Sequence, residues 1–69
     1  MQTAVVKIGD NLKRQRIRKA LTQEELARRA ELTTASVARI ERNETEPRMS
    51  TLRKLAKALK VDPAELVEE

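Results

Sequence analysis

Apolar residues recur at the spacing of an α-helix along most of this chain. Ile8 and Leu12, four residues apart, predict a helix over residues 8–19, whose remaining surface is strongly basic. A longer apolar stripe predicts another helix over residues 49–60, because its spacing of i, i+3, i+4 and i+7 places the side chains on one face. This stripe consists of Leu52, Leu55, Ala56 and Leu59.

Two shorter helices are predicted between residues 19 and 49. The signal for each is a capping residue at its start. Residues 22–25, Thr-Gln-Glu-Glu, form a capping box, in which the threonine hydroxyl and the last glutamate each bond the other residue's amide. This box starts a helix that ends near residue 31. Thr33 or Thr34 is expected to cap the following helix, which turns Val37 and Ile40 inward.

The two ends of the chain differ from its middle. Asp62 as an N-cap and Pro63 at the first helical position predict a short last helix over residues 63–67. Residues 1–7 carry no helix-start signal and are interpreted as an N-terminal arm, and residues 68–69 as an acidic C-terminal end. The sequence therefore predicts one all-α domain of five helices over residues 8–67.

The residue types that are missing exclude most chemistry. The 69 residues contain no His, Cys, Phe, Tyr or Trp, so they offer no imidazole, thiolate, disulfide or aromatic stacking platform. With one glycine, Gly9, they also lack a glycine-rich loop that cradles phosphate. The longest apolar run, residues 4–6, is too short for a membrane helix. We expect a cytoplasmic binding protein that is not an enzyme and uses no cofactor, metal or membrane.

Charge is unevenly distributed along the chain. All 15 Lys and Arg residues lie within residues 1–60, together with seven of the 11 acidic residues. The last nine residues carry the other four acids. A basic body favours a polyanionic partner such as nucleic acid, although a solvated helical surface explains the same charges.

The second and third helices carry the functional signal. Two short consecutive helices joined by a tight turn have the geometry of a helix-turn-helix, whose second helix enters the major groove of DNA. The exposed stripe of the third helix is positive, lacks acids and includes small residues that allow close approach to bases. It consists of Thr34, Ala35, Ala38, Arg39 and Arg42.

Residues 21–30, LTQEELARRA, and residues 37–42, VARIER, resemble the phage-repressor (Cro/cI, or Xre) helix-turn-helix family. Pro47 and residues 51–59 are similar to that family's fourth helix, and the likeness extends over residues 8–67. The resemblance implies a compact five-helix, lambda-repressor-like domain that binds double-stranded DNA.

The resemblance also implies roles for matching positions. Contacts with bases are implied for Thr34, Ala35, Ala38 and Arg39. Contacts with phosphate or the minor groove are implied for Gln23, Thr33, Arg42 and Arg48. A structural salt bridge that orients the third helix is implied for Arg16 and Glu41.

Several positions depart from the family pattern. Ala20, Glu31 and Lys60 stand where the family often has glycine, and Asn43 is expected to adopt the left-handed conformation. If Glu31 requires a positive φ, this residue costs about 1 kcal/mol. Two acids, in the loop of residues 43–46, stand where relatives are often basic, which weakens phosphate binding and leaves Arg48 to offset them.

These features favour a sequence-specific transcriptional regulator, interpreted as a repressor. Because one helix offers few base contacts, we expect a homodimer that reads a palindrome. An antitoxin or other protein-interaction module, with a toxin as partner, is an alternative, and a restriction–modification controller protein is another. The residues expected to be left over for a self-interface are Val61, Leu66 and Val67, with Val5 and Val6 from the arm.

Overall fold

Helices form where the periodicity and caps predict them. The computed structural model describes residues 8–67, so the expected arm over residues 1–7 and the acidic end over residues 68–69 lie outside the described residues. The predicted all-α fold is confirmed, and the predicted helix bounds differ from the observed ones by one or two residues. The helices are α1 (Ile8–Arg18), α2 (Gln23–Ala30), α3 (Thr34–Glu41), α4 (Met49–Leu59) and α5 (Ala64–Val67).

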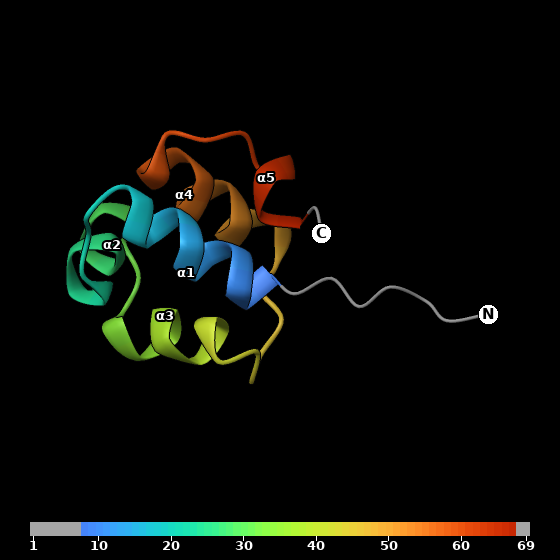
Figure 1. Ribbon diagram of the computed structural model, residues 1–69. Helices are drawn as coiled ribbons and strands as arrows, with labels where there is room; N and C mark the ends of the chain where they lie inside the picture. The colour runs from blue at the N-terminus through green and yellow to red at the C-terminus, as the bar shows by residue number, and fades with distance from the viewer. Residues whose placement is uncertain (1–7, 68–69) are drawn as a thin grey trace.

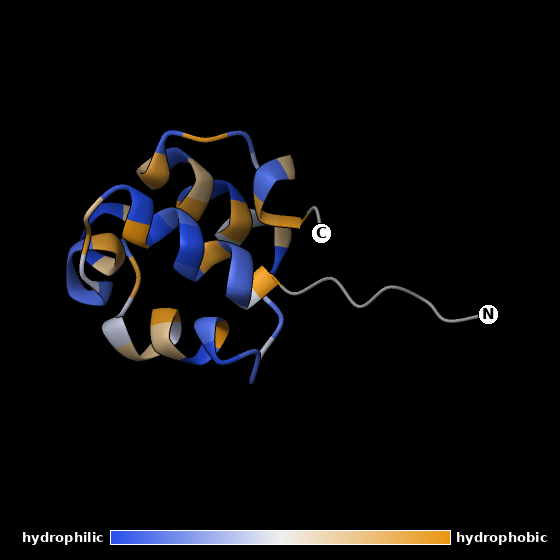
Figure 2. Cartoon of the chain, viewed as in Figure 1, coloured by the Kyte–Doolittle hydropathy of each residue, from blue (hydrophilic) through white to orange (hydrophobic). Residues whose placement is uncertain are grey.

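The helices surround one apolar core. In Figure 1, α1 crosses the middle of the molecule, α3 runs along one side, and α4 and α5 lie on the opposite side. Figure 2 shows hydrophobic residues gathered on helix surfaces that face one another. Fully burying one such side chain contributes about 1.5–3 kcal/mol. The largest fully buried side chains are Leu12, Leu26, Val37, Leu55, Leu59 and Leu66.

Within residues 8–67, four tight turns use the left-handed conformation without glycine. Ala20, Glu31, Asn43 and Lys60 have φ values of 57°, 60°, 61° and 59°. The left-handed conformation expected for Asn43 is confirmed, and the three residues that stand where the family often has glycine adopt it too. After α2, the amide of Leu32 donates to the carbonyl of the residue five positions earlier at 2.8 Å, which closes the helix end. Each left-handed non-glycine residue costs about 1–2 kcal/mol, so these turns are strained.

Gly9 lies where α1 passes close to the end of α3. A Cβ atom there would overlap the carbonyl oxygen of Ile40 and lie 2.6 Å from Asn43 Oδ1. The Gly9 amide donates to that same Asn43 oxygen at 3.0 Å. Glycine is therefore required here for close packing, in a helical residue whose φ is not positive.

Two buried amides connect α1 to the end of the chain. Asn11 Nδ2 donates to the Leu66 carbonyl oxygen at 3.0 Å, and Gln15 Nε2 donates to Glu65 Oε1 at 3.4 Å. Leu66 itself has 0% exposure and packs in the core. This corrects the expectation that Leu66 contributes to a self-interface, because the monomer already buries its side chain completely.

The described helices are all short. None of those in residues 8–67 has the length and apolar character needed to cross a lipid bilayer.

Candidate nucleic-acid interface

The capping box fixes the start of α2. Thr22 Oγ1 accepts from the Glu25 amide at 3.0 Å, and Glu25 Oε1 accepts from the Thr22 amide at 2.8 Å. Hydrogen bonding of the Glu25 carboxylate to the backbone amide of Thr22, and more weakly to the Thr22 side chain, lowers the pKa of the Glu25 carboxyl. The predicted cap is therefore present and favours a charged Glu25.

A second threonine starts α3 directly after the turn. Thr33 Oγ1 accepts from the Ser36 amide at 3.1 Å and donates to Ser36 Oγ at 2.9 Å. Thr33 rather than Thr34 is therefore the cap, which leaves Thr34 as the first residue of the helix. Both threonines are exposed at the end of α3 that follows the turn.

A buried network of hydrogen bonds holds α3 against α1 and α2. Glu41, 7% exposed, accepts from Arg16 twice: from Nε at 2.6 Å and from Nη2 at 3.1 Å. Arg16 Nη1 also donates to the Leu21 carbonyl oxygen at 2.8 Å. The ion pair expected between Arg16 and Glu41 is thus present, and it joins α1 and α3.

Gln23 belongs to the same network, which sequence reasoning missed. Its Nε2 donates to Glu41 Oε1 at 3.0 Å, although the expected partner of this amide is a DNA phosphate. An amide nitrogen carries two hydrogens, so one remains for another acceptor. The phosphate contact of Gln23 stays a prediction, and its observed partner connects α2 to the end of α3.

The outward face of α3 is small and cationic. Thr34, Ala35 and Arg39 are exposed, whereas Ala38 is half-buried. Glu41 is the only acid within α3, and its side chain is turned inward to Arg16. The exposed face therefore presents a long cation beside small residues, with no acid from the helix itself.

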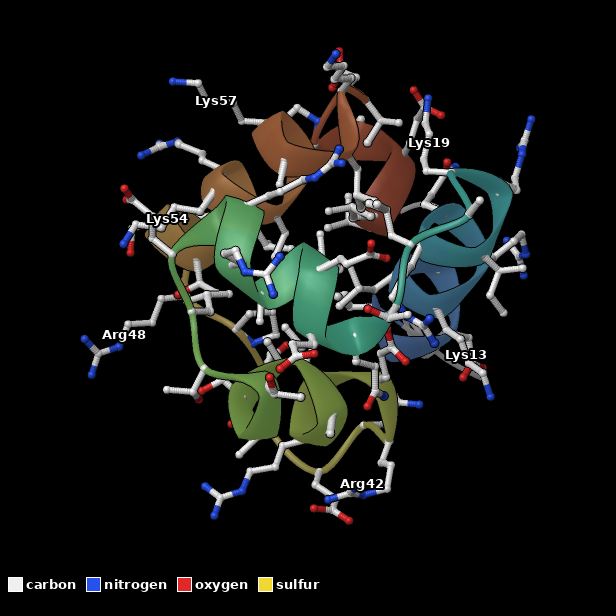
Figure 3. The ribbon with its side chains drawn as sticks, turned by 90° about the vertical axis from the view of Figure 1, so that its left-hand side faces the viewer. Lys13, Lys19, Arg42, Arg48, Lys54 and Lys57 are labelled. Carbon is white, nitrogen blue, oxygen red and sulfur yellow. The ribbon has the colours of Figure 1, made fainter. Side chains whose placement is uncertain are left out.

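Arg39 and Arg48 flank a groove between α3 and the start of α4. The groove has a volume of about 330 Å³ and includes Ser36, Pro47 and Thr51 in its wall. Arg48 occupies the N-cap of α4 and forms no side-chain cap hydrogen bond. In Figure 3 the Arg48 side chain points outward at the left of the view, and Arg42 lies at the bottom.

Arg42 is paired with an acid from the next loop. Its Nε lies 2.7 Å from Glu44 Oε2, and its Nη2 lies 3.1 Å from Glu44 Oε1. The hydrogen bond from Arg42 is the main cause that lowers the pKa of Glu44, and the same bond raises the pKa of Arg42. Acids in this loop are expected from the sequence to weaken phosphate binding, but the sequence did not reveal that Glu44 pairs with Arg42.

The cations of a second groove are explained by the helix ends beside it. About 380 Å³ in volume, it lies where α2 and α4 both end, and Figure 3 shows Lys54 and Lys57 projecting outward from this side. Basic residues near a helix C-terminus offset the negative end of the helix dipole. The cations along this groove are Arg29, Lys54, Lys57 and Lys60.

Buried polar groups in residues 8–67 are satisfied internally. No buried side-chain nitrogen or oxygen of the described part lacks a hydrogen-bond partner. The same residues contain no group of three acidic or other metal-ligating side chains that could hold a metal ion. Asn11 and Gln15 were missed as buried residues, although their spacing places them on the core face with Leu12.

The chain is similar to known proteins in sequence and in structure. A family model described as helix-turn-helix matches residues 12–66. The restriction-modification controller protein C.AhdI from Aeromonas hydrophila has a similar structure, with a TM-score of 0.85, 38% identity, and coverage of 88% of this chain and 92% of that chain. No curated protein sequence matches significantly.

Two further structures are similar over most of both chains. The N-terminal DNA binding domain of SinR from Bacillus subtilis has a TM-score of 0.84 at 32% identity, covering 90% of this chain and 91% of that chain. The P22 c2 repressor protein in complex with a synthetic operator has a TM-score of 0.83 at 27% identity, covering 96% and 97%. The family expected from the sequence is therefore confirmed.

The comparisons agree with the geometry. The structure combines three features: two helices joined by a tight turn with a left-handed residue, a buried ion pair behind α3, and a small cationic face in front of α3. The chain belongs to the Cro/cI-type (Xre) helix-turn-helix family of DNA-binding transcriptional regulators, whose members are not enzymes.

Proposed function

We propose that this chain is a homodimeric repressor that reads a palindromic DNA operator with α3 in the major groove. The outward face of α3 carries this proposal, because Thr34, Ala35 and Arg39 are exposed there without a competing acid from the helix. An α-helix with its side chains is about 10–12 Å in diameter. The major groove is about 12 Å wide and admits such a helix.

Each side chain on this face has a chemical role. Arg39 is suited to bond O6 and N7 of one guanine, and Ala35 to contact a thymine methyl group. Ala38 offers less surface because it is half-buried. Thr34 can bond a base edge as donor or acceptor. Contacts with the phosphate backbone are assigned to Gln23, Thr33, Arg42 and Arg48.

Two copies are needed for adequate specificity. A single helix offers few hydrogen-bonding side chains to bases, and each good pair discriminates by about 1–3 kcal/mol. A two-fold dimer would read half-sites about 34–36 Å apart. Val67, 37% exposed, and the half-buried Val61 are the candidates for its interface. Sedimentation of Val67→Asp, compared with the equally charged Ile17→Asp on α1, tests whether Val67 supports dimerisation.

Repression requires only that the protein occupies a promoter. The likeness to C.AhdI favours a second candidate with the same DNA-binding mechanism, which is a controller of a restriction–modification system. The position of the selected DNA site distinguishes the two: a controller site would lie beside a methyltransferase or endonuclease gene in the source genome.

Selection from a random duplex pool tests the proposed function. We expect a palindromic winner that binds at least ~10³-fold tighter than random DNA. Binding should also weaken linearly with the logarithm of salt concentration. A salt-dependent affinity without an enriched sequence would contradict base reading, and no affinity for duplex DNA would favour the toxin-binding alternative.

A further inference from the structure

Glu44 pairs with Arg42 at the end of the exposed α3 face. Its carboxylate accepts two hydrogen bonds from Arg42, at 2.7 and 3.1 Å. Its pKa is lowered first by Arg42 and, more weakly, by the charge of Arg39. Glu44 is therefore charged at neutral pH and faces the cations that are assigned to DNA.

The backbone fixes Glu44 in this position. Its amide donates to the Arg39 carbonyl oxygen at 3.0 Å, which ties the loop to the last turn of α3. Asn43, just before it, has a φ of 61° and holds the Gly9 amide through its side chain. The acid is thus attached to the end of α3 by the same turn that closes the helix.

The two-point contact imitates a DNA contact. A guanidinium bonds the two oxygens of a carboxylate and the two oxygens of a phosphate with the same planar geometry. In the free protein, Glu44 occupies the edge of Arg42 that carries Nε and Nη2. A phosphate that approaches this edge must displace the carboxylate.

We propose that Glu44 is an internal competitor that exchanges with a DNA phosphate at Arg42. The inference rests on the proposed function, because it requires α3 to meet DNA. Each binding event replaces one carboxylate contact by one phosphate contact, so Glu44 lowers the affinity for DNA. Because neither partner in the exchange is a base, the affinity for a selected site and for random DNA falls by the same factor.

The variant Glu44→Gln tests the exchange, with Glu46→Gln as its matched control. Both acids are exposed in the same loop, and both changes remove one negative charge, but among residues 8–67 an ion pair is found for Glu44 and none for Glu46. We expect Glu44→Gln to tighten selected and random duplexes alike, by about threefold or more at low salt. Its plot of log affinity against log salt should steepen by about 0.9, and that of Glu46→Gln should not.

A second background isolates the contact with Arg42. With Arg42→Gln in place, Glu44→Gln should affect DNA binding no more than Glu46→Gln does. An unchanged effect of Glu44→Gln in that background overturns the inference, and so does weaker binding by Glu44→Gln alone. If wild type binds no duplex, the proposed function fails. If wild type binds duplex DNA and the variants Glu44→Gln and Glu46→Gln bind it with equal affinity, only the competitor inference fails.

Discussion

Arg16 and Glu41 meet between α1 and α3, with Arg16 Nε 2.6 Å from Glu41 Oε2, and their side chains are 13% and 3% exposed. The carboxylate also accepts from Gln23 at 3.0 Å, so three helices converge on one buried acid. Both carboxylate oxygens of Glu41 accept hydrogen bonds from inside the domain, so the pair ties the end of α3 to α1.

Removing this acid should destabilise the fold. In Glu41→Ala, the Arg16 guanidinium stays largely buried without its counter-ion, which costs about 3–5 kcal/mol when a buried pair is broken. A chain of this size is stable by roughly 3–10 kcal/mol, so the variant approaches unfolding. Urea denaturation followed by circular dichroism measures the loss. The double variant Arg16→Met, Glu41→Leu should recover most of it, and a cost below about 0.5 kcal/mol in the single variant would contradict a stabilising pair.

The periodicity and the caps were sufficient to predict the helices, because apolar spacing and cap chemistry are local properties. Thr22 and the left-handed Asn43 could be placed in this way, and the cap of α3 was predicted to within one residue, Thr33 or Thr34. Pairings between side chains of different segments cannot be predicted from local patterns, and the pair of Arg16 and Glu41 was expected only through the family resemblance. The bond from Gln23 to Glu41 depends on how the first turn of α2 packs on the last turn of α3. The burial of Leu66 depends on α5 folding back onto α1.

Glycine at the turn between α2 and α3 should stabilise the protein. Glu31 has a φ of 60°, which costs a residue with a Cβ about 1–2 kcal/mol. Part of this is offset because glycine gives the unfolded chain more freedom, so Glu31→Gly should gain about 0.5–1 kcal/mol. Thermal denaturation should show a Tm about 2–8 °C higher. Glu24→Gly, the same change inside α2, should lower the Tm, and an equal fall for both would contradict strain at residue 31.

Adding one methyl group at Gly9 should have the opposite effect. Alanine is the better helix former by about 1 kcal/mol, but its Cβ would overlap the Ile40 carbonyl and crowd Asn43. Overpacking of this kind costs about 1–3 kcal/mol, so Gly9→Ala should be destabilised despite its helix propensity. Chemical denaturation gives the difference in free energy of unfolding. A more stable variant would mean that α1 can move away from α3 without loss.

The capping box should make part of the stability depend on pH. Because its bonds to Thr22 lower the pKa of Glu25 in the folded state, its contribution is present above the ordinary glutamate pKa of about 4.3 and is lost as the pH falls through the folded pKa. Glu25→Gln keeps an acceptor oxygen but has no charge to lose. The Tm advantage of wild type over this variant should therefore shrink between pH 7 and pH 3. A constant difference over that range would contradict a charged cap.

Arg39 is expected to contact a base and Gln23 a phosphate. Substituting each of them distinguishes the two kinds of contact by their effect on selected and random DNA. Arg39→Ala should cost about 1–3 kcal/mol on the selected site and relax the preference at one base pair, with a smaller loss on random DNA. Gln23→Ala, at the start of α2, should instead weaken all sequences alike, because its remaining N–H is assigned to phosphate. Titrations of selected, single-mismatch and random duplexes by fluorescence anisotropy distinguish the two variants. Equal losses of affinity for selected and random DNA in Arg39→Ala would make Arg39 a phosphate contact. A loss confined to the selected site in Gln23→Ala would make Gln23 a base contact.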